Sequence, residues 1–176
     1  MSKRSSVLLD NASLIRKGVF SIADAQEALG WSRGELLPFL FRLVKKGKLA
    51  RVKRGLFCMV PPGFTDLKAG YPQNWFIIAR ALAEGKPYFI SYYSAMHLNG
   101  MTSEAIQTIF ISRSEQRRLP KGLRIPIRFI TIPKKRFWGL EEKWVTHEDR
   151  VWVSNLERTA FDAVDRPDLA GGISEI

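Results

Sequence analysis

The sequence predicts an α+β protein with two domains. A small helical domain that ends in a hairpin comes first, and a mixed α/β domain with a mainly antiparallel sheet follows it. Three observations support this class. Apolar residues recur at helical spacing over residues 8–46, two short strand-like runs follow at residues 49–60, and residues 74–165 alternate between helix-like and strand-like segments. At 176 residues, the chain is long enough for two small cores.

The first two helices are expected at residues 8–17, ended by Gly18, and from Ser21 to Gly30. Ser21 and Asp24 have the spacing of a capping box, in which a side chain at each position accepts a backbone N–H of the first turn. The short segment 29–31 then forms the tight turn of a helix-turn-helix.

The third helix begins with a second capping box, formed by Ser32 and Glu35, and ends at Gly47. Pro38 lies within it, so we expect a kink or a later start. One side of the helix is predicted to be apolar. Its members are Leu36, Leu37, Phe39, Leu40, Phe41, Leu43 and Val44.

Two short strands, residues 49–52 and 56–60, follow the third helix. Between them Lys53, Arg54 and Gly55 form a hairpin tip, where the glycine can adopt a positive φ. A helix with a basic outer face, followed directly by a hairpin with a basic tip, is the arrangement of a winged helix-turn-helix. We assign this domain to residues 1–62.

Residues 63–72 are interrupted by glycine and proline and are predicted to be a linker, which leaves 73–176 for the second domain. This domain is expected to be shortened at its C-terminus. Its basic segment 113–122 is predicted to be a long hairpin loop between two strands. The expected helices are 74–83, 91–98 and 154–164, and the expected strands are 88–90, 105–112, 123–132 and 151–153.

The charge of the chain favours a polyanionic partner. The formal net charge is +11, and it is concentrated in two blocks. Residues 1–60 carry twelve Lys and Arg against four Asp and Glu, and residues 113–143 carry ten against three. Double-stranded DNA is the natural partner for the first block, because there the charge coincides with the winged-helix pattern.

The candidate DNA-binding residues lie on the third helix and the hairpin. The first turn of the helix is expected to approach base edges in the major groove, and the later cations are expected to contact phosphates. The full set is Ser32, Arg33, Gly34, Glu35, Pro38, Arg42, Lys45, Lys46, Arg51, Lys53 and Arg54.

The second basic block is a candidate surface for DNA, RNA or a protein partner. Phe137 and Trp138 lie beside it, and packing is a better explanation for them than base stacking. The basic residues concerned are Arg113, Arg117, Arg118, Lys121, Arg124, Lys134, Lys135 and Arg136.

Catalysis is not expected, and we predict no catalytic residue, metal site or cofactor. Glu141-Glu142-Lys143 resembles the end of a nuclease motif, but the chain has no Asp between Asp66 and Asp149 to share a metal. His147-Glu148-Asp149 is typical of a solvated turn, and Arg158 with Asp162 is typical of a structural ion pair. Nothing in the sequence marks an effector pocket, so a pocket in the second domain large enough for an effector would favour a ligand sensor.

A cytoplasmic location is expected. The single cysteine, Cys58, excludes a disulfide framework and is interpreted as a small buried side chain. The sequence contains no apolar run long enough to span a membrane and no signal-peptide pattern.

Several segments together resemble the AbiEi-type antitoxins, the transcriptional regulators of type IV toxin–antitoxin modules. In the first domain the resemblance covers 43–47 and 51–57. In the second it covers Ser91 to Gly100, Ser154 to Asp162 and the pair Gly171-Gly172. The order and spacing of these segments are more specific than any one of them alone.

This resemblance implies a repressor that binds inverted repeats in its own promoter. It also implies an antitoxin in phage defence that counteracts a nucleotidyltransferase-like toxin without forming a stable complex. We expect a monomer in solution that binds DNA cooperatively. The alternative is a protein that binds nucleic acid without sequence preference, or a nuclease-like enzyme that acts through the basic second domain.

Overall fold

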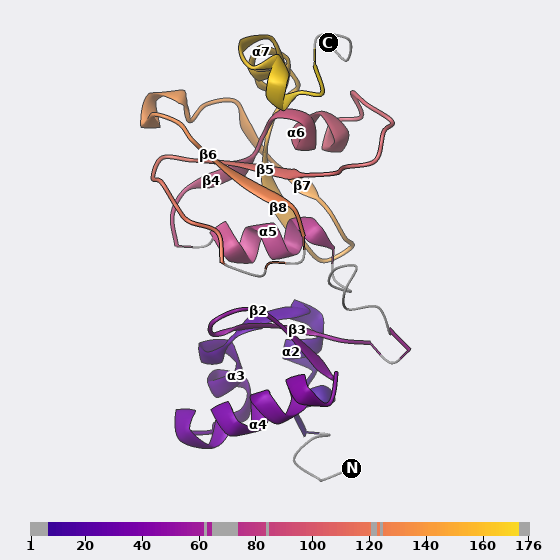
Figure 1. Cartoon of the computed structure of the whole chain (residues 1–176), viewed down its shortest axis with the longest axis vertical. Helices are drawn as coiled ribbons and strands as arrows, with labels where there is room; N and C mark the ends of the chain where they lie inside the picture. The colour runs from indigo at the N-terminus through magenta and orange to yellow at the C-terminus, as the bar shows by residue number, and fades with distance from the viewer. Residues whose placement is uncertain are drawn as a thin grey trace. The chain divides into compact units, whose positions relative to one another are not determined.

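The computed structural model describes residues 7–61, 63–64, 74–83, 85–120, 123 and 125–172. The chain forms two compact units, Met1–Asn74 with Pro120–Arg124, and Trp75–Leu119 with Ile125–Ile176 (Figure 1). The predicted α+β class, with an N-terminal winged helix and a second sheet-containing domain, is confirmed. Of the predicted linker, only Gly63 and Phe64 lie within the described residues, so its limits stay a prediction.

The first unit combines helices with a three-stranded antiparallel sheet in the order β1-β3-β2. Its elements are α2 (Ala12–Lys17), β1 (Val19–Ser21), α3 (Ile22–Leu29), α4 (Arg33–Lys45), β2 (Leu49–Lys53) and β3 (Leu56–Met59). Strand β1 was not predicted. It pairs with β3, and the sheet therefore continues beyond the hairpin that the sequence indicated.

Both predicted capping boxes are present. Ser21 accepts the N–H of Asp24 while the Asp24 carboxylate accepts the N–H of Ser21, at 3.1 and 2.7 Å. The same reciprocal bonds join Ser32 and Glu35. The boxes determine the residues at which α3 and α4 begin, and with them the faces that these helices present.

The predicted first helix is interrupted rather than continuous. Residues 7–9 are helical, and α2 begins separately at Ala12, because the Asn11 side chain caps it by accepting the N–H groups of Ser13 and Leu14. Ile15, within the predicted helix, is 51% exposed. Val19, which follows Gly18, starts β1 opposite Cys58.

Helix α4 runs from Arg33 to Lys45 with Pro38 inside it. Its buried side chains are Leu36, Phe39, Leu40 and Leu43. The predicted apolar face is wrong at Phe41, which is 47% exposed. The prediction failed there because seven apolar residues in nine positions cannot all fit on one side of a single helix.

The core of the first unit joins all three helices to the sheet. Trp31, in the turn between α3 and α4, packs edge-on against Phe39 with ring centroids 5.1 Å apart. Cys58 is fully buried, as predicted. The core residues are Leu8, Leu14, Phe20, Ile22, Ala25, Leu36, Phe39, Leu40, Leu43, Leu49 and Phe57.

The second unit is a five-stranded sheet in the order β6-β5-β4-β8-β7, with α5 on one face and α6 and α7 on the other (Figure 1). Its helices are α5 (Trp75–Ala83), α6 (Tyr92–Leu98) and α7 (Leu156–Asp165), with 3₁₀ turns η1 (Lys134–Arg136) and η2 (Pro167–Leu169). Its strands are β4 (Tyr88–Ile90), β5 (Ile109–Arg113), β6 (Ile127–Thr131), β7 (Leu140–Trp144) and β8 (Arg150–Ser154).

The strand directions differ from the predicted hairpin. Strands β5 and β6 are parallel, with Ile111 opposite Phe129, so the segment between them crosses back along the sheet instead of forming a hairpin loop. The pairings β4–β5 and β7–β8 are antiparallel, whereas β4–β8 is parallel. Alternating apolar residues identify a strand but not its direction, which is why the hairpin prediction was wrong.

Strand β7 was missed because Glu141, Glu142 and Lys143 give it little apolar character. It lies at the edge of the sheet, where charged residues are common. Glu142 pairs with Arg150 of the neighbouring strand at 3.4 Å, and Lys143 pairs with Glu141 at the same distance.

Buried polar groups join α6 to α7. The Asn99 amide donates to the Thr159 hydroxyl at 2.8 Å and to the Ser154 carbonyl at 3.0 Å. Ser94 links α6 to β5, because its hydroxyl donates to the Thr108 carbonyl and accepts the Phe110 N–H, both at 2.9 Å. The two C-terminal segments that carry the family resemblance are therefore held against one another and against the sheet.

Arg158 of α7 is the largest fully buried side chain in the described part of the chain. It donates from Nε to the Asp162 carboxylate at 2.9 Å and from Nη1 to the Arg136 carbonyl at 2.6 Å. Its guanidinium lies over the Trp138 ring, 4.6 Å from the centroid. The predicted ion pair is therefore present and buried, and Trp138 has the packing role that was expected.

Burial raises the pKa of Asp162 above its ordinary value of 3.8, and the hydrogen bond and charge of Arg158 only partly oppose this. Burial also raises the pKa of Tyr92, with a smaller contribution from the Asp162 charge. Tyr92 begins α6 with a φ of +52°, a strained value for a residue with a side chain. The interior between the sheet and helices α6 and α7 therefore contains polar and ionisable groups as well as apolar side chains.

None of the described helices has the length and apolar character that crossing a lipid bilayer requires.

Candidate nucleic-acid interface

The outward side of α4 is a stripe of exposed residues. The side chains in the N-terminal half of this stripe are short. Gly34, Pro38, Phe41 and Lys45 follow one another at three- and four-residue spacing, with Arg42 beside them, and all five are exposed. A methyl group added at Gly34 would have no heavy atom within 4 Å. Another molecule can therefore approach the first half of this stripe closely.

Ser32 and Glu35 take part in the helix cap. The Ser32 hydroxyl is 2.7 Å from the Glu35 carboxylate, and both side chains also bond to the backbone of the cap. Both residues are exposed, as is Arg33 between them. The predicted base-reading turn thus presents one long cation beside two side chains that already stabilise the helix.

The β2–β3 hairpin forms the predicted wing. Its two-residue turn is Arg54-Gly55, and Gly55 has a φ of +79°, which a residue with a side chain rarely adopts. The Gly55 carbonyl accepts the Ile22 N–H at 3.1 Å, so the tip is fixed to the start of α3. Arg54 is exposed at this tip, and Lys53 beside it is half-buried.

Arg51 connects the wing to α4. Its guanidinium lies over the Phe41 ring at 5.7 Å from the centroid, and its Nε donates to the Lys53 carbonyl at 3.4 Å. Because one side chain touches both elements, the exposed side of β2 and the outward stripe of α4 form one surface.

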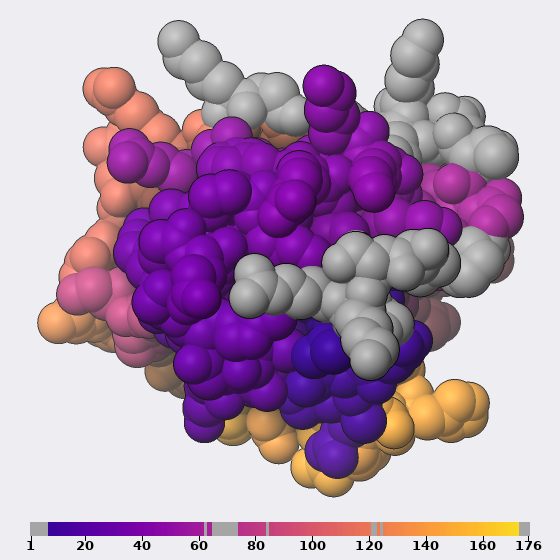
Figure 2. All heavy atoms as spheres, turned by 90° about the horizontal axis from the view of Figure 1, so that it is seen from below, coloured from indigo at the N-terminus to yellow at the C-terminus, as the bar shows by residue number. Residues whose placement is uncertain are grey.

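We call this surface the basic face. Arg42 lies over the Phe39 ring at 5.9 Å, which holds its stem against the helix. Figure 2 draws the atoms as spheres, with those of the first unit in indigo to purple. Of the residues predicted to bind DNA, every one except the half-buried Lys53 is exposed. They are Ser32, Arg33, Gly34, Glu35, Pro38, Arg42, Lys45, Lys46, Arg51, Lys53 and Arg54.

Residues 8–60 match a family of transcriptional regulators. The description of this family is "Transcriptional regulator, AbiEi antitoxin". The match covers the elements of the first unit from α2 to β3 and confirms the resemblance that the sequence showed there. The AbiEi match ends at Val60, so it does not extend to the second unit.

A solved structure shares the fold. The crystal structure of the RV2827C protein from Mycobacterium tuberculosis aligns with a TM-score of 0.52 at 20% sequence identity. The alignment covers 73% of this chain and 45% of that one, so this chain spans less than half the length of RV2827C. No curated protein matches the chain.

One member of the second basic block is buried. Arg113 is 3% exposed and donates to the Ala83 carbonyl at 3.3 Å, so it is part of the interior. Burial lowers the pKa of its guanidinium, and Arg117 adds to this effect. Arg136 pairs with Asp165 at 2.8 Å. This surface prediction is therefore wrong for Arg113.

The other members of this block remain untested candidates. Arg118, Lys134 and Lys135 are exposed, Arg117 is half-buried, and Lys121 and Arg124 lie outside the described residues. Phe137 packs edge-on against Phe89 with centroids 5.3 Å apart, which supports packing as its role.

The motifs weighed as enzymatic have structural partners. Asp149 pairs with Arg80 and accepts a hydrogen bond from Thr146 in a turn. Within the described part of the chain, no group of three or more His, Cys, Asp or Glu side chains is placed to hold a metal ion.

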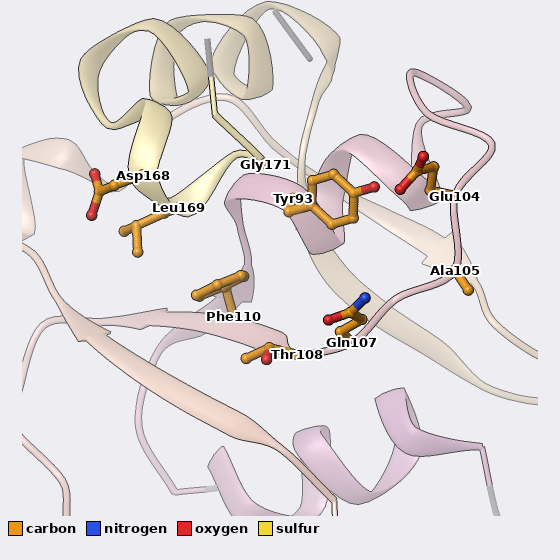
Figure 3. Close-up of a pocket in the computed structure, with 9 residues that line it drawn as sticks. All are labelled: Tyr93, Glu104, Ala105, Gln107, Thr108, Phe110, Asp168, Leu169 and Gly171. Atoms are coloured by element: carbon orange, nitrogen blue, oxygen red, sulfur yellow. The ribbon is translucent and has the colours of Figure 1, made fainter. Parts of the chain in front are cut away.

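A pocket that the sequence did not reveal lies in the second unit. It has a volume of about 330 Å³, near the lower end of the range for small-molecule sites. Figure 3 shows Tyr93 of α6, Glu104 and Gln107 of the following loop, and Leu169 of η2 around it. Asp168 also lines the pocket, but both of its carboxylate oxygens accept hydrogen bonds from Arg166 at 2.8 Å.

Proposed function

We propose that this protein is a DNA-binding transcriptional repressor and the antitoxin of a type IV toxin–antitoxin module. The observation that carries the proposal is the basic face, on which α4 and the wing present cations on one continuous exposed surface. The AbiEi match over the same residues supports it. This role requires no catalytic step, and we propose a non-enzymatic, cytoplasmic protein without a cofactor.

Double-stranded DNA fits the basic face in shape as well as charge. An α-helix fits the major groove, and the low relief at Gly34 and Pro38 lets the backbone of α4 sit close to the base edges. Arg42, Lys45 and Lys46 lie where they can contact phosphates on either side of the groove. Arg54 at the wing tip extends these contacts to the neighbouring backbone or minor groove.

The proposed operator is a pair of inverted repeats in the protein's own promoter, bound cooperatively by monomers. The proposed partner is a nucleotidyltransferase-like toxin that the protein counteracts without a stable complex. The second unit, whose α6 and α7 contain the remaining resemblance segments, is the part that we assign to this antitoxin role.

The test of DNA binding is a gel-shift titration against the DNA upstream of the protein's gene, with a scrambled duplex alongside, at two salt concentrations. A preference of about a hundredfold or more for the native sequence that is retained at the higher salt supports the repressor. Equal and steeply salt-sensitive binding to both duplexes contradicts it and favours nucleic-acid binding without sequence preference.

Variants then test the basic face. Arg42→Ala and Arg54→Ala should weaken binding to both duplexes and flatten the dependence of affinity on salt, because each removes a phosphate contact. Arg33→Ala should instead alter sequence preference. Arg128→Ala removes an exposed cation from β6 of the second unit and is the charge-matched control. If Arg42→Ala and Arg128→Ala behave alike, the assignment of the face is wrong.

Toxin neutralisation is tested by growth. Co-expression with the nucleotidyltransferase-class toxin of the same operon should restore growth, while the two purified proteins should elute separately on gel filtration. Failure to restore growth contradicts the antitoxin role and leaves DNA binding intact.

A further inference from the structure

Phe41 differs from the other residues of the basic face because it is large and apolar. It is 47% exposed on the outward stripe of α4, three residues after Pro38 and four before Lys45. A single exposed apolar side chain is ordinary on a protein surface. This one requires an explanation because it lies in the middle of a surface of cations and is held there by one of them.

Arg51 holds the Phe41 ring against the wing. The guanidinium covers one side of the ring at 5.7 Å from its centroid, and the Nε bond to the Lys53 carbonyl restrains the arginine in turn. A cation–π contact of this kind favours orientations in which one face of the ring lies against the guanidinium. Its remaining surface faces solvent on the side on which the proposed DNA would lie.

The neighbours of Phe41 leave its ring prominent. Gly34 and Pro38, which precede it along the stripe, carry no long side chain, and a methyl at Gly34 would meet nothing within 4 Å. Arg42 and Lys45 are long cations that suit phosphates. If α4 lies in the major groove of DNA, Phe41 is therefore the apolar side chain of this stripe that faces the base edges.

The chemistry of base edges limits what such a ring can contact favourably. In the major groove, guanine, cytosine and adenine present hydrogen-bond donors and acceptors, and only thymine presents an apolar group, its C5 methyl. A phenyl ring placed against a donor or acceptor would remove it from water without replacing its hydrogen bond. A phenyl ring placed against the thymine methyl buries apolar surface on both partners.

We infer that Phe41, held by Arg51, is a specificity-determining residue that recognises the C5 methyl group of thymine in the bound DNA. This inference rests on the proposed DNA binding through the basic face. It adds to that proposal the base that is recognised, thymine. It also places a base contact at Phe41, beyond the first turn of α4, although the sequence had predicted base contacts within that turn.

The experiment uses uracil, which differs from thymine only by the absent methyl group. Duplexes are first selected by the full-length protein from a library with a random core. Each thymine of a selected duplex is then replaced singly by uracil. At one or two positions the replacement should weaken binding about threefold to fivefold, as expected for one buried methyl group. Phe41→Ala should bind the two duplexes equally.

Two further variants serve as controls. Ile15→Ala removes an apolar side chain of similar exposure, 51%, from α2, and it should retain full sensitivity to uracil. Phe41→Leu keeps an apolar group at the position and should retain most of that sensitivity, which shows that the contact, rather than the integrity of the helix, is measured.

The outcomes separate the two proposals. Failure to select any duplex above the random pool contradicts the proposed function itself. Selection of a defined sequence in which no uracil replacement weakens binding overturns the role of Phe41 and leaves the repressor proposal standing. Uracil sensitivity that persists unchanged in Phe41→Ala also overturns it, because another residue must then contact the methyl group.

Discussion

Removal of the Asp162 carboxylate should destabilise the second unit strongly. In Asp162→Ala, the Arg158 guanidinium keeps its bond to the Arg136 carbonyl and its place over the Trp138 ring, but it loses its ion-pair partner, 2.9 Å away. Arg158 is 1% exposed, so water cannot replace the lost acceptor without opening the α7 packing.

The expected loss follows from the burial of the pair. Breaking a buried ion pair by removing one partner typically costs about 3–5 kcal/mol. The lower part of that range applies here, about 3 kcal/mol, because Arg158 retains a carbonyl acceptor and an aromatic face. The second Asp162 oxygen makes no hydrogen bond within the described residues, so its removal adds no further loss.

The assay is urea unfolding followed by tryptophan fluorescence, since Trp138 lies directly beside the pair. Asp168→Ala is the matched control. This substitution removes a carboxylate that lies 2.8 Å from the Arg166 guanidinium. That pair lies on the surface, where ion pairs contribute little to stability. A shift of the midpoint in Asp162→Ala no larger than that in Asp168→Ala would refute the reasoning, because burial would then have no effect on the strength of the pair.

Two other changes test the local structure. Gly139→Ala should destabilise the second unit more than Gly100→Ala does in thermal melts. Both glycines have a positive φ, but only at Gly139 would the new methyl lie 2.9 Å from the Cβ of Arg158, and equal losses would argue against a packing role. Burial alone would raise the pKa of Asp24, but its hydrogen bonds, led by the one from Lys17, outweigh burial and hold it below 3.8. A lowered pKa in the folded state adds stability above pH 3.8 that is lost as the pH falls through the lowered value. The difference in unfolding free energy between wild type and Asp24→Asn should therefore shrink below pH 3.8, and a constant difference from pH 5 to pH 2 would contradict this account.

The starts of the helices in the first unit were predictable because the signals are local. Ser21 with Asp24 and Ser32 with Glu35 identify the residues at which α3 and α4 begin, and the structure has both boxes. Gly55 likewise indicated the wing turn. Each of these features depends on residues within four positions of one another, which is the range that a sequence shows directly.

The features that were missed depend on partners distant in the sequence. Strand β1 exists because Val19 faces Cys58, and β6 runs parallel to β5 because the chain crosses the sheet between them. Phe41 was assigned to the core because an apolar residue in an apolar helix usually belongs there. It lies outside because Leu36, Phe39, Leu40 and Leu43 fill the inner side of α4. Its contact with Arg51, ten residues later, is one that no helical pattern includes.

The division of α4 into two independent faces has a consequence for how this protein can change over evolutionary time. Leu36, Leu40 and Leu43 hold the helix to the core, while none of the residues on the outward stripe supports the fold through a buried side chain. Substitutions on that stripe can therefore accumulate with little loss of stability. Under the proposed function, a lineage can acquire a new operator while keeping the same scaffold, and paralogues in one cell can diverge in the promoters they recognise before the rest of the chain diverges.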